Sequence, residues 1–139
     1  MIQRDFIKRQ LEELGRALGK IISDILKLKD LGKVNEGIMM ANETLENTFE
    51  LDIENIFAHP LDNFVETLTK EKKYSSVHLN YLGDLLYATA ELFEEKGEVE
   101  KAKILYQKVL AIFIHVNETE KTFSLARNNK METIRLTKK

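Results

Sequence analysis

The sequence predicts an all-α protein of about six helices, and three observations lead to this fold class. Apolar residues recur at spacings of three and four along most of the chain, which places them on one face of a helix. No segment alternates apolar and polar residues as a half-buried strand would. The 139 residues include only one proline, so few positions interrupt a helix.

A long first helix is predicted over residues 3–30. Gly32 follows it at the position where a left-handed residue ends many helices. Gly15 and Gly19 lie four residues apart inside this helix and form a smooth face for close packing. The alternative is that they only make the helix locally more flexible. The apolar stripe has alternating spacings of four and three residues and consists of Ile7, Leu11, Leu14, Leu18, Ile21, Ile25 and Leu28.

Two shorter helices and a connector are predicted next. The first of these helices covers residues 34–49. Residues 50–60 lack a sustained helical period, and the residue before Pro60 disfavours helix, so this segment is the main connector. A further helix is predicted over residues 61–70.

The most apolar part of the chain predicts a pair of central helices. Ser75 or Ser76 can cap the first of them, over residues 77–96, by accepting a free backbone N–H. Because this helix is apolar nearly all round, we expect it to be buried on more than one side. Gly97 ends it, and its partner covers residues 98–116.

A last helix of weaker periodicity is predicted over residues 119–136. Asn117, with Glu120 three residues later, resembles a capping box that opens it. Its apolar positions are Phe123, Ala126, Met131 and Ile134.

An internal repeat links two of the predicted turns. Residues 31–37 and 96–102 are similar at an offset of 65 residues, and each lies between two helices. Residues 83–116 resemble a tetratricopeptide repeat, although Thr89 and Ile114 depart from its pattern. The matching large, small, aromatic and glycine positions are Leu86, Ala90, Phe93, Gly97, Ala102, Tyr106 and Val109. Residues 18–51 form a more degenerate copy.

Two stretches resemble a family of uncharacterised bacterial proteins with tetratricopeptide-like (TPR-like) helices: the opening Met1 to Arg9 and residues 92–110. The resemblance implies one TPR-like domain over residues 1–139, built of antiparallel helix pairs of the right-handed α-solenoid type. Its parts are a degenerate repeat 18–51, a connector with extra helices 52–82, a better repeat 83–116 and a C-terminal capping helix 119–136. It implies no activity.

Composition and charge exclude several classes of function. The absence of cysteine excludes thiol catalysis and cysteine zinc sites. No apolar run reaches the roughly 18–20 residues of a membrane span, and no signal peptide opens the chain, so a cytoplasmic protein without membrane contact is predicted. Residues 34–120 carry a net charge of −10 between basic ends of +3 and +5. Because an acidic body repels phosphate, nucleic acid is not an expected partner.

No catalytic or metal-binding motif is evident. The two Gly-Lys pairs, at 19–20 and 32–33, lack the other residues of a phosphate loop. His59, His78 and His115 are far apart in sequence and lack metal-ligand spacing. We therefore predict no enzyme activity, no cofactor and no metal, and an enzyme of unrecognised type is only a remote alternative.

The TPR pattern also predicts which residues line a groove. In the second copy the groove positions are Asp84, Tyr87, Glu91, Glu94 and Glu95, four of them acidic. This candidate acidic groove suggests a basic protein or peptide as partner, while the alternative is that exposed positions of an acidic region are simply acidic. The same positions of the first copy include Ile22 and Leu26, which we expect to be covered.

The function predicted from these features is a protein-interaction or scaffolding module. The alternative is a structural homodimer formed through the long first helix. Its candidate self-association face consists of Leu11, Gly15, Leu18, Gly19, Ile22 and Leu26.

The basic C-terminal helix is predicted to pack on the last repeat. Apolar packing would come from Phe123, Ala126 and Ile134, and a cation from Arg127, Lys130 or Arg135 would approach the acidic groove positions. The chain would then fill its own groove. The alternative is a solvated tail beside an open groove.

Overall fold

The structure, a computed structural model, describes residues 2–121 and 123–139, with residues 2 and 3 described by their backbone alone. Met1, in the N-terminal motif, and Thr122, in the predicted last helix, lie outside this part. The all-α prediction is confirmed: the described residues form seven α-helices, a short 3-10 helix and no strand. The elements are α1 (Ile2–Asp30), α2 (Val34–Phe49), α3 (Ile53–Ala58), η1 (Leu61–Asn63), α4 (Phe64–Lys70), α5 (Ser76–Glu95), α6 (Val99–Glu120) and α7 (Leu125–Thr137).

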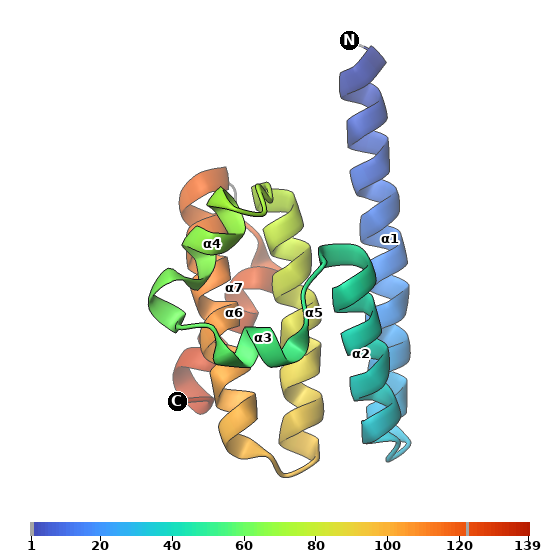
Figure 1. The fold of residues 1–139 in the computed structure, drawn as a ribbon, viewed down its shortest axis with the longest axis vertical. Coiled ribbons are helices and arrows are strands. Elements are labelled where there is room, and N and C mark those ends of the chain that lie inside the picture. The colour runs from blue at the N-terminus through green and yellow to red at the C-terminus, as the bar shows by residue number, and fades with distance from the viewer. Residues whose placement is uncertain (1, 122) are drawn as a thin grey trace.

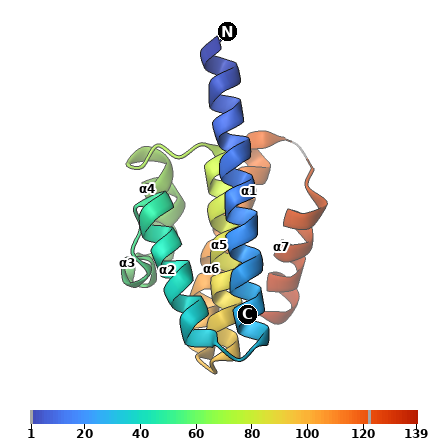
Figure 2. The same ribbon diagram turned by 90° about the vertical axis from the view of Figure 1, so that its right-hand side faces the viewer.

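Two antiparallel helix hairpins, α1–α2 and α5–α6, lie side by side and make up most of the molecule (Figure 1). Helix α5 packs against both helices of the first hairpin as well as against α6, so it occupies the centre. Helices α3 and α4 cover α6 on one side, and α7 folds back along α6 on another (Figure 2). The N-terminal end of α1 projects beyond the other helices (Figure 1).

The two hairpin turns have the same backbone geometry. Gly32 and Gly97 both adopt positive φ, +76° and +89°, which a residue without Cβ tolerates best. In each turn the residue after the glycine donates its N–H to a carbonyl five positions back, as in a Schellman motif. These bonds join Lys33 to Leu28 at 2.8 Å and Glu98 to Phe93 at 2.9 Å. The repeated sequence therefore folds into a repeated turn.

The core is centred on α5, which is buried along most of its length as its apolar pattern predicts. Gly83 on α5 lies directly against the ring of Phe113 on α6, with no room for a Cβ. Ala90 and Ala102 are both buried between these helices. The lack of a side chain at Gly83 thus allows the close approach of α5 and α6 at this point.

The predicted connector contains a helix that its sequence did not reveal. Helix α3 begins after Asp52, whose carboxylate accepts a hydrogen bond from the Glu54 N–H at 3.3 Å. It has only six residues, too few to show a period of 3.6. Ser75, as predicted, caps α5 by accepting from the His78 N–H at 3.3 Å.

The predicted start of the last helix is wrong. Helix α6 continues through Asn117 to Glu120, and Lys121 ends it with a φ of +58°. Helix α7 begins only at Leu125, where Ser124 accepts from the Arg127 N–H at 3.2 Å. The reason is that the Asn117 amide is bonded to α7 side chains and does not act as a cap.

Candidate functional site

A groove between α1, α5 and α7 is the candidate functional site. The ribbons of these three helices are seen in Figure 2. Its volume is about 270 Å³. It unites residues that the sequence assigned to two different surfaces. The lining residues are Gly19, Ile22 and Leu26 from α1, Asp84, Tyr87, Ala88 and Glu91 from α5, and Lys130 from α7.

The inner surface of this groove is apolar because of residue size and helix position. Ala88 on α5 is buried, and its small side chain leaves space between the neighbouring helices. Ile22 and Leu26 lie one helical turn apart on α1 and are half-buried against the core. A Cβ added at Gly19 would meet no atom within 4 Å, so this end of the groove is open.

The acidic positions of the groove are paired with lysines of the same chain. Lys130 on α7 contacts Asp84 at 2.9 Å, which confirms the predicted approach of this cation. Glu91 contacts Lys29 on α1 at 3.4 Å. Each pair is partly exposed and contributes only about 0–1 kcal/mol to stability. The pairs therefore influence how the helices are oriented more than how tightly they pack.

The remaining two predicted acidic residues lie at the end of α5, outside the groove. Glu94 contacts Lys138 at 2.8 Å and accepts a hydrogen bond from the Tyr106 hydroxyl at 3.3 Å. Glu95 is exposed. The five predicted positions therefore divide into three that line the groove and two that do not.

Two tyrosine hydroxyls near these carboxylates are held in the protonated form. Burial, with the nearby carboxylates of Glu91 and Glu94, raises the pKa of both Tyr87 and Tyr106 above the ordinary value of 10.0. Their rings meet edge to face with centroids 5.5 Å apart. At neutral pH both hydroxyls are therefore protonated, and that of Tyr106 donates to Glu94.

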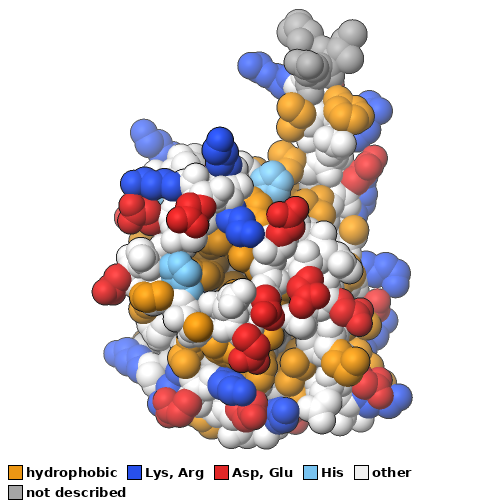
Figure 3. Space-filling view, viewed as in Figure 1, with side chains coloured by type: hydrophobic (Ala, Val, Ile, Leu, Met, Phe, Trp, Pro, Cys, Tyr) orange, Lys and Arg blue, Asp and Glu red, His pale blue; other side chains and the backbone are white. Residues whose placement is uncertain are grey.

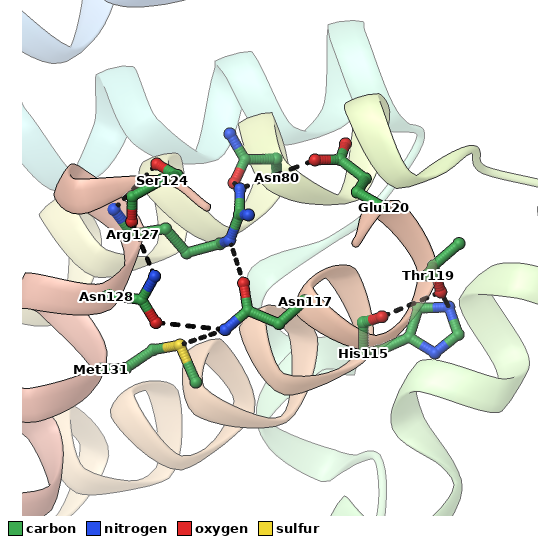
Figure 4. Close-up of polar contacts among 9 residues, drawn as sticks. All are labelled: Asn80, His115, Asn117, Thr119, Glu120, Ser124, Arg127, Asn128 and Met131. Atoms are coloured by element: carbon green, nitrogen blue, oxygen red, sulfur yellow. Dashed lines mark hydrogen bonds and ion pairs between the residues drawn. The ribbon is translucent and has the colours of Figure 1, made fainter. Parts of the chain in front are cut away.

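Helix α7 forms its wall of the groove because a buried arginine anchors it (Figure 4). The Arg127 side chain is 4% exposed and donates to Asn117 Oδ1 at 2.7 Å and to Asn80 Oδ1 at 3.0 Å. Its guanidinium also contacts the Glu120 carboxylate at 3.8 Å. These contacts join α7 to α5 and α6 and fix the position from which Lys130 reaches the groove.

The apolar docking of α7 differs from the prediction. Ile134 is fully buried as expected, and Met131 is buried beside it. Phe123 is 78% exposed and Ala126 is also exposed, so these two residues do not dock the helix. The late start of α7 explains the difference, because Phe123 precedes the helix and Ala126 lies on its outer side.

The structure divides the candidate self-association face. Leu18 is buried within its own chain, and a Cβ at Gly15 would lie 2.5 Å from the Tyr81 hydroxyl oxygen. That hydroxyl donates to the Leu11 carbonyl at 3.0 Å. The remaining three residues of the face line the groove. Gly15 therefore packs against α5 of the same chain, whereas Gly19 lies beside open space.

The histidines are spread over the surface and engaged locally. His59 Nδ1 lies 3.0 Å from the Pro60 carbonyl, His78 Nδ1 lies 2.8 Å from the hydroxyl of the capping Ser75, and His115 Nε2 lies 3.4 Å from the Thr119 hydroxyl. Within the described ranges, no three side chains capable of binding a metal gather in one place. Nor does any helix of those ranges combine the length and apolar character needed to cross a membrane.

Comparison of the chain with protein families, with curated protein sequences and with solved structures gives no match.

Proposed function

We propose that the protein is a protein-interaction module whose groove between α1, α5 and α7 binds a short amphipathic segment of a partner protein. The observation that carries this proposal is the pair of half-buried apolar side chains, Ile22 and Leu26, beside a polar rim. The volume of about 270 Å³ is below the roughly 300–1,000 Å³ typical of small-molecule pockets. It suits one or two side chains of a helix laid into a groove.

The paired charges of the groove define the kind of partner. Because Asp84 and Glu91 already contact lysines of the same chain, the groove does not need a basic ligand for neutrality. We therefore expect an apolar anchor to supply most of the affinity. A basic residue of the partner can replace Lys130 beside Asp84 at little cost, because such an exposed pair is weak.

Selection from a displayed library of random peptides tests this function. We expect selected peptides to bind the purified protein by fluorescence anisotropy and to lose at least about tenfold in affinity when Ile22 is changed to Glu. Met39→Glu is the matched control, because Met39 is 63% exposed on α2 and does not line the groove. Circular dichroism checks that both variants remain folded. Peptides that bind Ile22→Glu as tightly as the unaltered protein would place the interaction elsewhere.

A second candidate function, a homodimer, is supported by the projecting end of α1. Phe6 and Ile7 are 59% and 54% exposed there, and Figure 3 shows apolar side chains along this end. The seam would be displaced toward the N-terminus, because Leu18 is buried and Gly15 is covered by Tyr81 of the same chain. Sedimentation at high micromolar concentration tests it: a dimer that Ile7→Glu converts to a monomer would support self-association, and a monomer for the unaltered protein would exclude it.

A further inference from the structure

A second pocket, separate from the groove, lies between α6 and the segment from α3 to η1. Its volume is about 440 Å³, within the range typical of small-molecule sites. Its apolar walls include Leu61 and Ile104, which are 45% and 40% exposed. Phe57 also lines it and stacks edge to face on Phe93 with ring centroids 5.4 Å apart.

The unusual member of this pocket is Lys108 on α6. Its side chain is 2% exposed, although lysine is almost never fully buried without a partner of opposite charge. The ammonium group donates to the Ile56 carbonyl and lies 5.3 Å from the centroid of the Phe64 ring. No carboxylate of the described residues lies within ion-pair distance of it.

Burial of this cation opposes folding. Moving an ammonium from water to an apolar site without a counter-charge is costly, and burial lowers the pKa of Lys108 from its usual 10.5. The Ile56 carbonyl accepts from one of the three N–H donors of the ammonium group. A bound anion would supply the missing charge and accept a further hydrogen bond.

Cations outnumber carboxylates around the pocket and favour an anion. Lys103 and Lys139 line the pocket together with Lys108, against the single carboxylate of Glu100. Lys103 already lies 3.8 Å from Glu100, so its charge is partly compensated. His59 completes the polar lining. Lys108 therefore forms a buried part of the wall of an apolar pocket with a mixed-charge rim.

We propose that this pocket binds a small monoanionic molecule with an apolar body, of which a medium-chain carboxylate is the simplest form. The carboxylate accepts hydrogen bonds from the Lys108 ammonium, and the alkyl chain lies against Leu61, Phe57 and Ile104. Charge-assisted hydrogen bonds between a buried ammonium and a carboxylate are among the stronger polar contacts in proteins. The class of ligand thus follows from a single interior cation in an apolar cavity.

Calorimetric titration with three probes of equal chain length tests this inference. Octanoate should bind at a single site at least about tenfold more tightly than octan-1-ol, and octylammonium should not bind measurably. Methyl NMR signals of Leu61 and Ile104 should shift, while those of Ile22 and Leu26 in the groove should not. Equal affinity for octanoate and octan-1-ol, or no octanoate binding, would overturn the proposal.

Variants separate the ammonium from the apolar walls. Lys108→Met should abolish the preference for octanoate over octan-1-ol, and Lys33→Met, at an exposed position outside the pocket, should leave it unchanged. An undiminished preference in Lys108→Met would overturn the proposal. If Lys108→Met does not fold, the three-probe comparison in the unaltered protein decides the point by itself.

Discussion

Replacement of Arg127 by Met should release α7 from the rest of the molecule. The side chain is 4% exposed and makes two charged hydrogen bonds, at 2.7 and 3.0 Å, to asparagines on α6 and α5. Hydrogen bonds that involve a charged group contribute about 1.5–3 kcal/mol each, so their loss costs about 3–6 kcal/mol if α7 remains docked. The helix is otherwise held mainly by Met131 and Ile134, whose burial contributes about 1.5–3 kcal/mol each.

The cost of the lost hydrogen bonds is similar to the stabilisation from the burial of Met131 and Ile134. We therefore expect α7 to detach locally while the hairpins stay folded. Native-state hydrogen exchange measures this directly. A loss of about 3 kcal/mol corresponds to roughly a hundredfold faster exchange of α7 amides. The exchange rates of α5 amides should change far less, because α5 packs against three other helices.

The control is Arg135→Met, which removes the same kind of side chain from an exposed position of the same helix. It should leave α7 protection within severalfold of the unaltered protein. If the α7 amides are as well protected in the Arg127→Met variant as in the Arg135→Met variant, the buried hydrogen bonds of Arg127 are not what docks the helix. The groove would then not depend on it.

Three further perturbations have defined outcomes in chemical denaturation. Gly83→Ala should lower the free energy of unfolding by about 1–3 kcal/mol through overpacking, whereas Gly19→Ala, with open space beside it, should raise it by about 0.5–1 kcal/mol. A double-mutant cycle with Asp84→Asn and Lys130→Gln should give a coupling of about 0–1 kcal/mol, because the pair is partly exposed. The stability of the unaltered protein should rise as pH increases through the alkaline range below about 10, and this rise should be absent in Lys108→Met.

The sign of the pH effect follows from proton binding. The pKa of Lys108 is lower in the folded than in the unfolded chain, so between those two values the unfolded chain holds more protons and stability rises with pH. Above about 10, Tyr74, Tyr87 and Tyr106 act in the opposite direction, because burial raises the pKa of each hydroxyl, the first two being half-buried and the third fully buried. An equal rise in Lys108→Met would contradict this assignment. Destabilisation by Gly19→Ala would contradict the open space beside that glycine, and a coupling above about 2 kcal/mol would contradict the partial exposure of the Asp84–Lys130 pair.

Features governed by local sequence were the ones that the sequence predicted well. The extent of α1, the two glycine turns and the Ser75 cap each depend on residues close together in the chain. Helix α3 was missed because six residues show no period. The boundary between α6 and α7 was misplaced because Asn117 is bonded to side chains of the next helix rather than to its own backbone.

The site was predicted in parts and not as a whole. The opposite charges of the C-terminal segment and the acidic body indicated the contact between Lys130 and Asp84. That Ile22 and Leu26 share one groove with Tyr87 depends on the packing of α1 on α5, which spacing along the chain does not specify. The buried Lys108 gave no signal at all, because a lysine in a helix is normally an exposed residue.

The most direct test of the proposed groove is a methyl NMR titration of the protein with the tightest peptide from the displayed library. The proposal predicts that the largest shifts fall on Ile22 and Leu26, with Ile7 at the projecting end of α1 and Ile104 in the second pocket unaffected. Largest shifts at Ile7 or Ile104, with Ile22 and Leu26 unchanged, would contradict it.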